Sequence, residues 1–178
     1  MIDANKVLQD QLARSLGLDR YEEIMQGDPQ SSDFQRFFNG YYRIRRNEEW
    51  RQHYYALFCK AQDEHYSFGQ IITELYQNTG NIEASFSSKM LATIDASKPI
   101  WDQYVLQNLG LVLTGKTKEE KLQNAVRLYD SIVAWYEEYL KTVEANENIK
   151  AFDRLLPDYA WISNTTKMLF AGSLSGSF

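Results

Sequence analysis

Residues 67–94 carry the pattern that decides the fold, and they read SFGQIITELYQNTGNIEASFSSKMLATI. Ser67 and Gln70 have the spacing of a capping box, which starts a helix. The apolar residues after them recur at helical spacing up to Gly80, a residue type that commonly ends a helix in a left-handed conformation. Directly afterwards a four-residue spacing resumes with Ile82, Phe86, Met90 and Ile94. The stretch therefore predicts two helices joined by a very tight turn, a helical hairpin.

Helical signals continue on the N-terminal side of the hairpin. Asn47, followed by two glutamates, predicts the start of a regular helix with an aromatic inner face. Before it, a densely aromatic segment begins at Ser32 and predicts a further helix. Asp19 and Glu22 have capping-box spacing and predict a short helix that ends near Gly27. We therefore expect the chain before the hairpin to be helical.

The C-terminal side adds a loop and further helices. Pro99 interrupts the helical spacing, and Asp102 is placed to cap the next helix. Thr117, with Glu120 three positions later, introduces the longest predicted helix. This helix is expected to reach Val143, over about thirty residues or ~40 Å. Two shorter helical patterns follow it.

The chain as a whole reads as an all-α protein. No segment shows the alternation of apolar and polar residues that is typical of a strand. We expect a single domain of about eight to ten helices over residues 1–171, with the helical hairpin at its centre. Residues 172–178 are mostly glycine and serine, and we expect them to form a flexible tail.

Composition excludes several classes of protein. The 178 residues suffice for one core, and the single cysteine, Cys59, cannot form an intramolecular disulfide. The sequence contains no apolar run of membrane-spanning length and no secretory signal pattern, so we expect a cytoplasmic protein without membrane contact. The formal net charge of -5 disfavours a general grip on nucleic acid. Only a local basic patch is compatible with DNA as a partner.

Motifs for metal and cofactor chemistry are missing from the sequence. The two histidines, His53 and His65, have none of the spacings of a zinc or haem site. Gly110 and Gly115 lack both the preceding strand and the Gly-Lys-Ser/Thr ending of a phosphate-binding loop. We therefore expect neither a metal ion nor a cofactor.

A basic and aromatic run over residues 41–51 is the first candidate binding site. Its arginines are Arg43, Arg45, Arg46 and Arg51. They alternate with tyrosines and with Trp50, and cations beside aromatic rings suit contact with phosphates and stacking on bases. The run therefore predicts a DNA-binding surface. Alternatively, it is a loop and helix start whose arginines pair with Glu48, Glu49 or other acids.

The second candidate site lies after the hairpin turn. Backbone N–H groups at the helix start that follows Gly80 are placed to hold a phosphate oxygen. Lys89 lies on the second helix of the predicted hairpin, and the proline-bearing loop ends in Ile100, Trp101 and Asp102. Each side chain also has a structural interpretation: Asp102 as an N-cap, Lys89 as a solvated or ion-paired residue, and Trp101 as a core residue instead of part of a base pocket.

This order of hairpin, proline-bearing loop and helix-starting aspartate resembles the core of the helix-hairpin-helix DNA glycosylases, over about residues 67–110. In that family the hairpin grips the DNA backbone, the aspartate serves base excision, and bifunctional members add a lysine nucleophile. The resemblance places Gly80 at the first hairpin glycine and Asp102 at the catalytic aspartate. The family's lysine position falls near Glu83 or Ala84, and Lys89, further along the same helix, is the candidate nucleophile. The second hairpin glycine of the family is replaced near Ile82.

A wider resemblance covers about residues 34–169. The segments FNGYYRIRRNEEWR and SKMLATID resemble a group of bacterial helical proteins to which no activity is attached. Two functional hypotheses follow. The first is a glycosylase-like protein that binds nucleic acid, with Trp101 and Trp50 lining a base pocket. The second is a non-catalytic protein-interaction module or homodimer built on the same scaffold.

Overall fold

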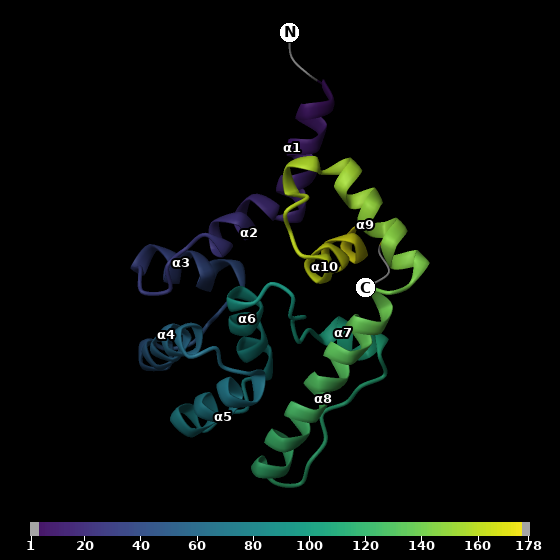
Figure 1. Ribbon diagram of the computed structural model, residues 1–178. Coiled ribbons are helices and arrows are strands. Elements are labelled where there is room, and N and C mark those ends of the chain that lie inside the picture. Colours follow the sequence, from purple (N-terminus) through teal and green to yellow (C-terminus); the bar gives the residue numbers. More distant parts are fainter. Residues whose placement is uncertain (1–3, 176–178) are drawn as a thin grey trace.

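The computed structural model describes residues 4–175, and this part of the chain contains helices and no strand (Figure 1). The all-α fold class is therefore confirmed, with ten α-helices in the described part. Their bounds are α1 (Ala4–Leu16), α2 (Leu18–Met25), α3 (Ser32–Tyr41), α4 (Glu48–Asp63), α5 (Phe68–Thr79), α6 (Ala84–Ile94), α7 (Gln103–Asn108), α8 (Lys118–Tyr139), α9 (Val143–Leu155) and α10 (Asn164–Ser175). A short 3-10 turn, η1 (Pro157–Tyr159), precedes α10.

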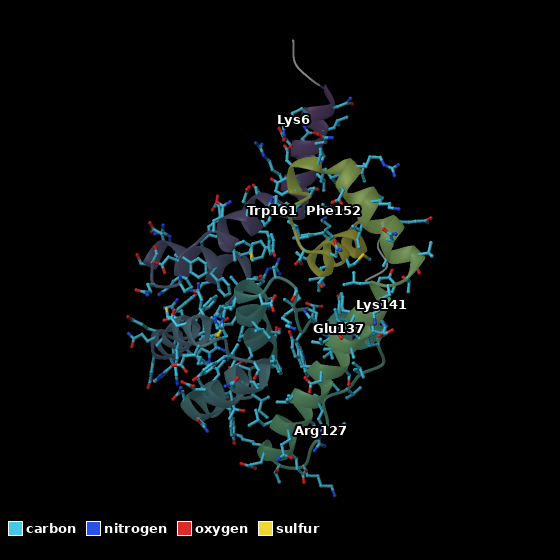
Figure 2. All side chains as sticks on the ribbon, viewed as in Figure 1. Lys6, Arg127, Glu137, Lys141, Phe152 and Trp161 are labelled. Atoms are coloured by element: carbon cyan, nitrogen blue, oxygen red, sulfur yellow. The ribbon has the colours of Figure 1, made fainter. Side chains whose placement is uncertain are left out.

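The helices surround two clusters of buried side chains. Helices α3 to α6 form one side of the larger cluster, and α8 runs along the other side (Figure 1). The smaller cluster lies where α1 and α2 meet α9 and α10, and Phe152 belongs to it (Figure 2). Lys6 of α1 pairs there with Asp158 of the 3-10 turn. No helix in residues 4–175 has the combination of length and apolarity that crossing a bilayer requires.

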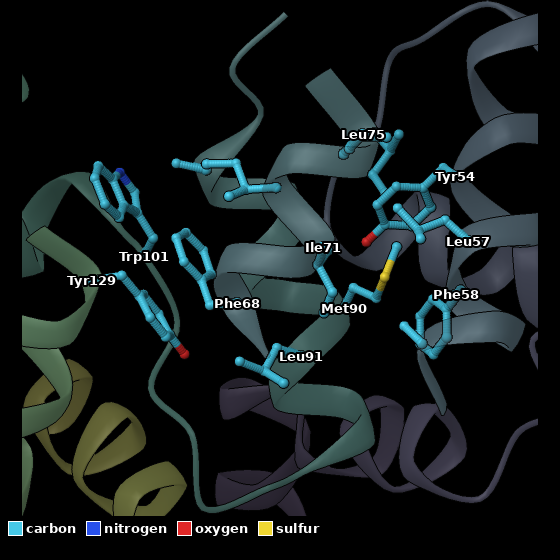
Figure 3. Close-up of a cluster of buried hydrophobic side chains, with 14 of the residues drawn as sticks. Tyr54, Leu57, Phe58, Phe68, Ile71, Leu75, Met90, Leu91, Trp101 and Tyr129 are labelled. Carbon is cyan, nitrogen blue, oxygen red and sulfur yellow. The ribbon is translucent and has the colours of Figure 1, made fainter. Parts of the chain in front are cut away.

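Stacked aromatic rings join the hairpin to the rest of the larger core. Phe68, the first residue of α5, stacks on Tyr129 of α8 with ring centroids 3.9 Å apart. Its centroid lies 6.3 Å from that of Trp101, and these two rings are nearly parallel (Figure 3). Large buried rings contribute strongly to core stability through apolar area and favourable ring geometry. This stack therefore connects α5, α8 and the loop before α7.

The predicted hairpin is present, and the residues at the ends of α5 have the expected capping bonds and backbone conformation. The Ser67 hydroxyl accepts the N–H of Gln70, whose side chain in turn accepts the N–H of Ser67, so the capping box is complete. Gly80 ends α5 with a left-handed φ of 69°. Residues 80–83 form the turn to α6. Asn47 caps α4 by accepting the N–H of Trp50 at 2.9 Å.

Three sequence-based predictions are corrected. The long helix expected to reach Val143 ends at Tyr139, and Thr142 starts a new helix by accepting the N–H of Ala145 at 3.1 Å. Because α2 begins at Leu18, before the expected capping box, it has Gly17 and no side-chain bond at its N-cap. Helix α10 continues to Ser175, so residues 172–175 are not the expected tail; residues 176–178 lie outside the described part.

Replacing Thr142 by alanine is expected to destabilise the fold by about 1 kcal/mol, because the first turn of α9 loses its hydroxyl acceptor. Urea unfolding followed by circular dichroism measures the change. Thr114→Ala is the matched control, because Thr114 is exposed and lies in the segment before α8. Equal unfolding free energies for the two variants would show that the Thr142 cap does not separate α8 from α9.

Candidate functional site

The structure brings Lys89 and Asp102 within electrostatic reach of each other. Lys89 lies on α6, and Asp102 immediately precedes α7, where its carbonyl accepts the N–H of Leu106 at 3.1 Å. Burial lowers the pKa of the Lys89 amine, and the negative charge of Asp102 partly opposes this shift. The two residues singled out by the glycosylase resemblance thus face a common region, and their catalytic roles stay predictions.

A cavity of about 450 Å³ is lined by Asp102 and not by Lys89. Ala92, which lies almost one helical turn after Lys89 on α6, also lines the cavity. Lys98 and Ile100 line it from the loop between α6 and α7. Further lining side chains come from α2, from α3 and the residue after it, and from α10. They are Tyr21, Tyr41, Tyr42, Thr166, Leu169 and Phe170. The walls combine aromatic rings with polar groups, as small-molecule sites commonly do.

Aromatic rings surround the Lys89 amine. Its nitrogen lies 5.4 Å from the ring centroid of Tyr42 and 5.4 Å from that of Phe86. Both distances suit cation–π attraction, which favours the protonated amine. Burial raises the pKa of Tyr41 to about 12 and raises that of Tyr42 further, so both hydroxyls keep their protons at neutral pH. The cavity therefore offers neutral tyrosine hydroxyls, and the ring of Tyr42 connects its wall to the partly desolvated amine of Lys89.

The pocket prediction for the two tryptophans is corrected. Trp101 is 7% exposed and stacks on Phe68, and Trp50 is 6% exposed and stacks on Tyr54 at 4.9 Å. Neither ring lines the cavity beside Lys89. Their large apolar surfaces pack in the core, in agreement with the alternative interpretation of Trp101 as a core residue.

The four arginines of the basic run have different environments. Arg46 forms an ion pair with Glu83 at 2.7 Å and lies over the rings of Trp50 and Phe86. Arg51 is half-buried in a polar groove between α3 and α4 that Cys59 also lines. Arg43 and Arg45 are exposed, and the Arg46 side chain is 41% exposed although it is paired. The ion pair gives Arg46 a structural role, and a phosphate-contacting surface is assigned to Arg43 and Arg45.

A side-chain carboxylate, that of Glu83, lies at the hairpin turn. Glu83 is the N-cap residue of α6, and its side chain is 7% exposed. Its negative charge stands beside the helix start, where a phosphate oxygen was expected to bind, and like charges repel. The Gly80 carbonyl accepts a bond from Lys118 at 2.9 Å. The phosphate-binding role of Gly80 stays a prediction, and the charge of Glu83 opposes it.

Side-chain hydroxyl groups hold the loop that leads to Asp102, a feature that the sequence pattern did not reveal. The carbonyls of Ala96, Ser97 and Pro99 accept bonds from hydroxyls of α8, of α10 and of the residue just before α10, and the Trp101 N–H donates to a hydroxyl of α6. The hydroxyl groups belong to Ser88, Tyr129, Ser163 and Thr165. These four residues lie far apart in sequence, so no local spacing identifies them.

The described part of the chain contains no group of three or more His, Cys, Asp and Glu side chains that could hold a metal ion. No protein-family model, curated protein or solved structure matches the chain in the comparisons. The functional argument therefore depends on the geometry of this site.

Replacing Arg46 by alanine is expected to destabilise the fold by roughly 2–3 kcal/mol, because the buried Glu83 carboxylate loses its partner. Chemical denaturation measures this difference. Arg45→Ala serves as the control and should stay within about 0.5 kcal/mol of the wild type, since Arg45 is exposed. A stable Arg46→Ala protein would contradict the structural role of the ion pair.

Proposed function

We propose that this chain is a glycosylase-like protein that receives a nucleobase or a sugar-bound base in the cavity and acts on it with Lys89 and Asp102. The observation that carries the proposal is the partly desolvated Lys89 amine, which interacts with Asp102 and lies over the ring of Tyr42, two residues that line the cavity. Clefts with these contents are the usual location of catalytic groups. The resemblance of the hairpin and the proline-bearing loop supports the same assignment.

The cavity suits a flat ligand with polar edges. Its volume of about 450 Å³ falls within the ~300–1,000 Å³ that is common for small-molecule sites. Tyr21, Tyr41 and Phe170 supply ring surfaces that can contact a planar ligand, and Thr166 adds a hydroxyl group. Asp102 can accept a hydrogen bond from the edge of such a ring. These groups match the two needs of a base pocket, which are contact with the flat face and hydrogen bonding at the edge.

Lys89 is suited to act as a nucleophile because burial favours its neutral form. A neutral amine can attack the anomeric carbon of a base-bearing sugar: the nitrogen–carbon bond forms while the bond to the base breaks. The departing base takes the bonding electron pair, and it gains the proton that the attacking nitrogen loses. The carboxylate of Asp102 would stabilise the positive charge that develops on the sugar. On a sugar that already lacks its base, the same amine forms an imine with the open-chain aldehyde and releases water.

A duplex with an abasic site should form a covalent adduct with Lys89 when cyanoborohydride reduces the imine. Mass spectrometry of the digested protein identifies the modified lysine. Because the neutral amine reacts and the Lys89 pKa is lowered, trapping should reach its plateau at a lower pH than for an ordinary exposed lysine. Lys89→Met should abolish the adduct, whereas Lys150→Met, on the exposed part of α9, should retain it.

Asp102→Asn should lower the trapping rate by at least about tenfold, because the carboxylate charge is lost while an asparagine can still cap α7. The melting temperature should change little. Asp130→Asn is the control, since Asp130 is exposed on α8. Adduct formation at another lysine, or equal rates for Asp102→Asn and Asp130→Asn, would contradict the assigned roles.

Contact with the DNA backbone is assigned to Arg43 and Arg45, which are exposed, whereas Arg46 is engaged with Glu83. Replacing both exposed arginines by alanine should weaken duplex binding and reduce the slope of log affinity against log salt by about 2, because two phosphate contacts are lost. Fluorescence anisotropy at several salt concentrations measures the slope. Arg36→Ala, on the exposed face of α3, is a control. An unchanged slope in the double variant would place the DNA contact elsewhere.

A further inference from the structure

The geometry of the Lys89 and Asp102 pair depends on how α6 is attached to the loop before α7. Ser88 makes this attachment, through a hydrogen bond between residues that are sequence neighbours of Lys89 and Asp102. Its hydroxyl oxygen accepts the N–H of Trp101 at 2.7 Å, and its proton goes to the carbonyl of Ser85 at 2.9 Å. Ser88 directly precedes Lys89, and Trp101 directly precedes Asp102. One hydrogen bond therefore joins the neighbours of the two candidate catalytic residues.

We infer that Ser88 is a positioning residue that holds the Asp102 carboxylate in its working arrangement with the Lys89 amine. Ser88 is fully buried, so water cannot easily replace its hydroxyl as the partner of the Trp101 N–H. Tyr129 fixes the same loop from α8 by donating to the Pro99 carbonyl at 2.8 Å. With that anchor in place, loss of the Ser88 bond shifts the loop at its Asp102 end.

Ser87 provides a matched control on the same helix. It has the same side chain and, like Ser88, is fully buried. Its hydroxyl oxygen makes no hydrogen bond within the described residues. Ser87→Ala and Ser88→Ala therefore remove the same atom at neighbouring buried positions, and only the second removes a bond to the Asp102 loop.

The titration of Lys89 reports on the position of Asp102 without requiring any enzymatic activity. The amines are methylated with ¹³C-formaldehyde and a reductant, and NMR follows the Lys89 signal against pH; Lys89→Arg assigns the signal. The other titratable groups around the pair are Tyr42 after α3, Lys98 from the loop, Tyr136 from α8, and Tyr21 and Tyr41 in the cavity wall. All of them are unchanged in the serine variants, so a difference in the Lys89 midpoint reports on Asp102.

Asp102→Asn should lower the midpoint of Lys89, because an attracting negative charge is lost. Ser88→Ala should lower it in the same direction by a smaller amount. Ser87→Ala should leave it at the wild-type value. Ser88→Cys, which nearly preserves the size and is a weaker acceptor, should fall between wild type and Ser88→Ala, and it replaces Ser88→Ala if that variant does not fold. A wild-type midpoint in both Ser88 variants would overturn the inference.

The catalytic consequence of Ser88 rests on the proposed function, and the two can fail separately. If Ser88→Ala lowers the Lys89 midpoint but wild-type protein traps no abasic duplex, the proposed function is wrong and the positioning role stands. If the wild type traps the duplex and Ser88→Ala keeps both the wild-type midpoint and the wild-type trapping rate, the positioning role is wrong. Support for both requires a lowered midpoint together with a slower trapping rate than in Ser87→Ala.

Discussion

Hydrogen bonds from side-chain hydroxyls to the backbone of residues 96–101 are the constraint on which the candidate site depends. This loop belongs to no helix, so its carbonyl groups need other partners in the interior. Tyr129 and Thr165 supply them from α8 and α10, and Ser88 receives a loop N–H from α6. Three helices thereby determine the path of one short segment. The positions of Lys98 and Asp102 follow from that path.

The sequence predicts those helix ends that are set by several neighbouring residues. The capping box at Ser67 and the left-handed Gly80 act within a few residues, so the sequence identifies the hairpin without tertiary information. The break before α9 was missed because the apolar spacing continues across it, whereas the Thr142 cap depends on a single hydroxyl. The start of α2 was missed because Gly17 precedes the helix without any side-chain cap. Weak or single-residue signals therefore account for these errors.

The candidate site could be predicted only in part. Lys89 and Asp102 were singled out because each lies next to a recognisable local pattern, the hairpin and the proline-bearing loop, and their catalytic roles stay predictions. The cavity could not be found this way, because Tyr21 and Phe170 come from opposite ends of the chain. The tryptophans were misplaced for a related reason: a ring suits a ligand pocket and a core equally well in sequence, and only packing distinguishes them.

The two halves of α6, the second hairpin helix, lie in different environments. At its start, the buried carboxylate of Glu83 pairs with the partly exposed Arg46, and the carboxylate disfavours a phosphate there. Further along, the environment is aromatic, and the amine of Lys89 lies over rings that exclude water. A carboxylate near the turn thus stabilises the scaffold without competing with Asp102 for the amine. The acidic start of α6 is therefore separated along the helix from the aromatic surroundings of the Lys89 amine.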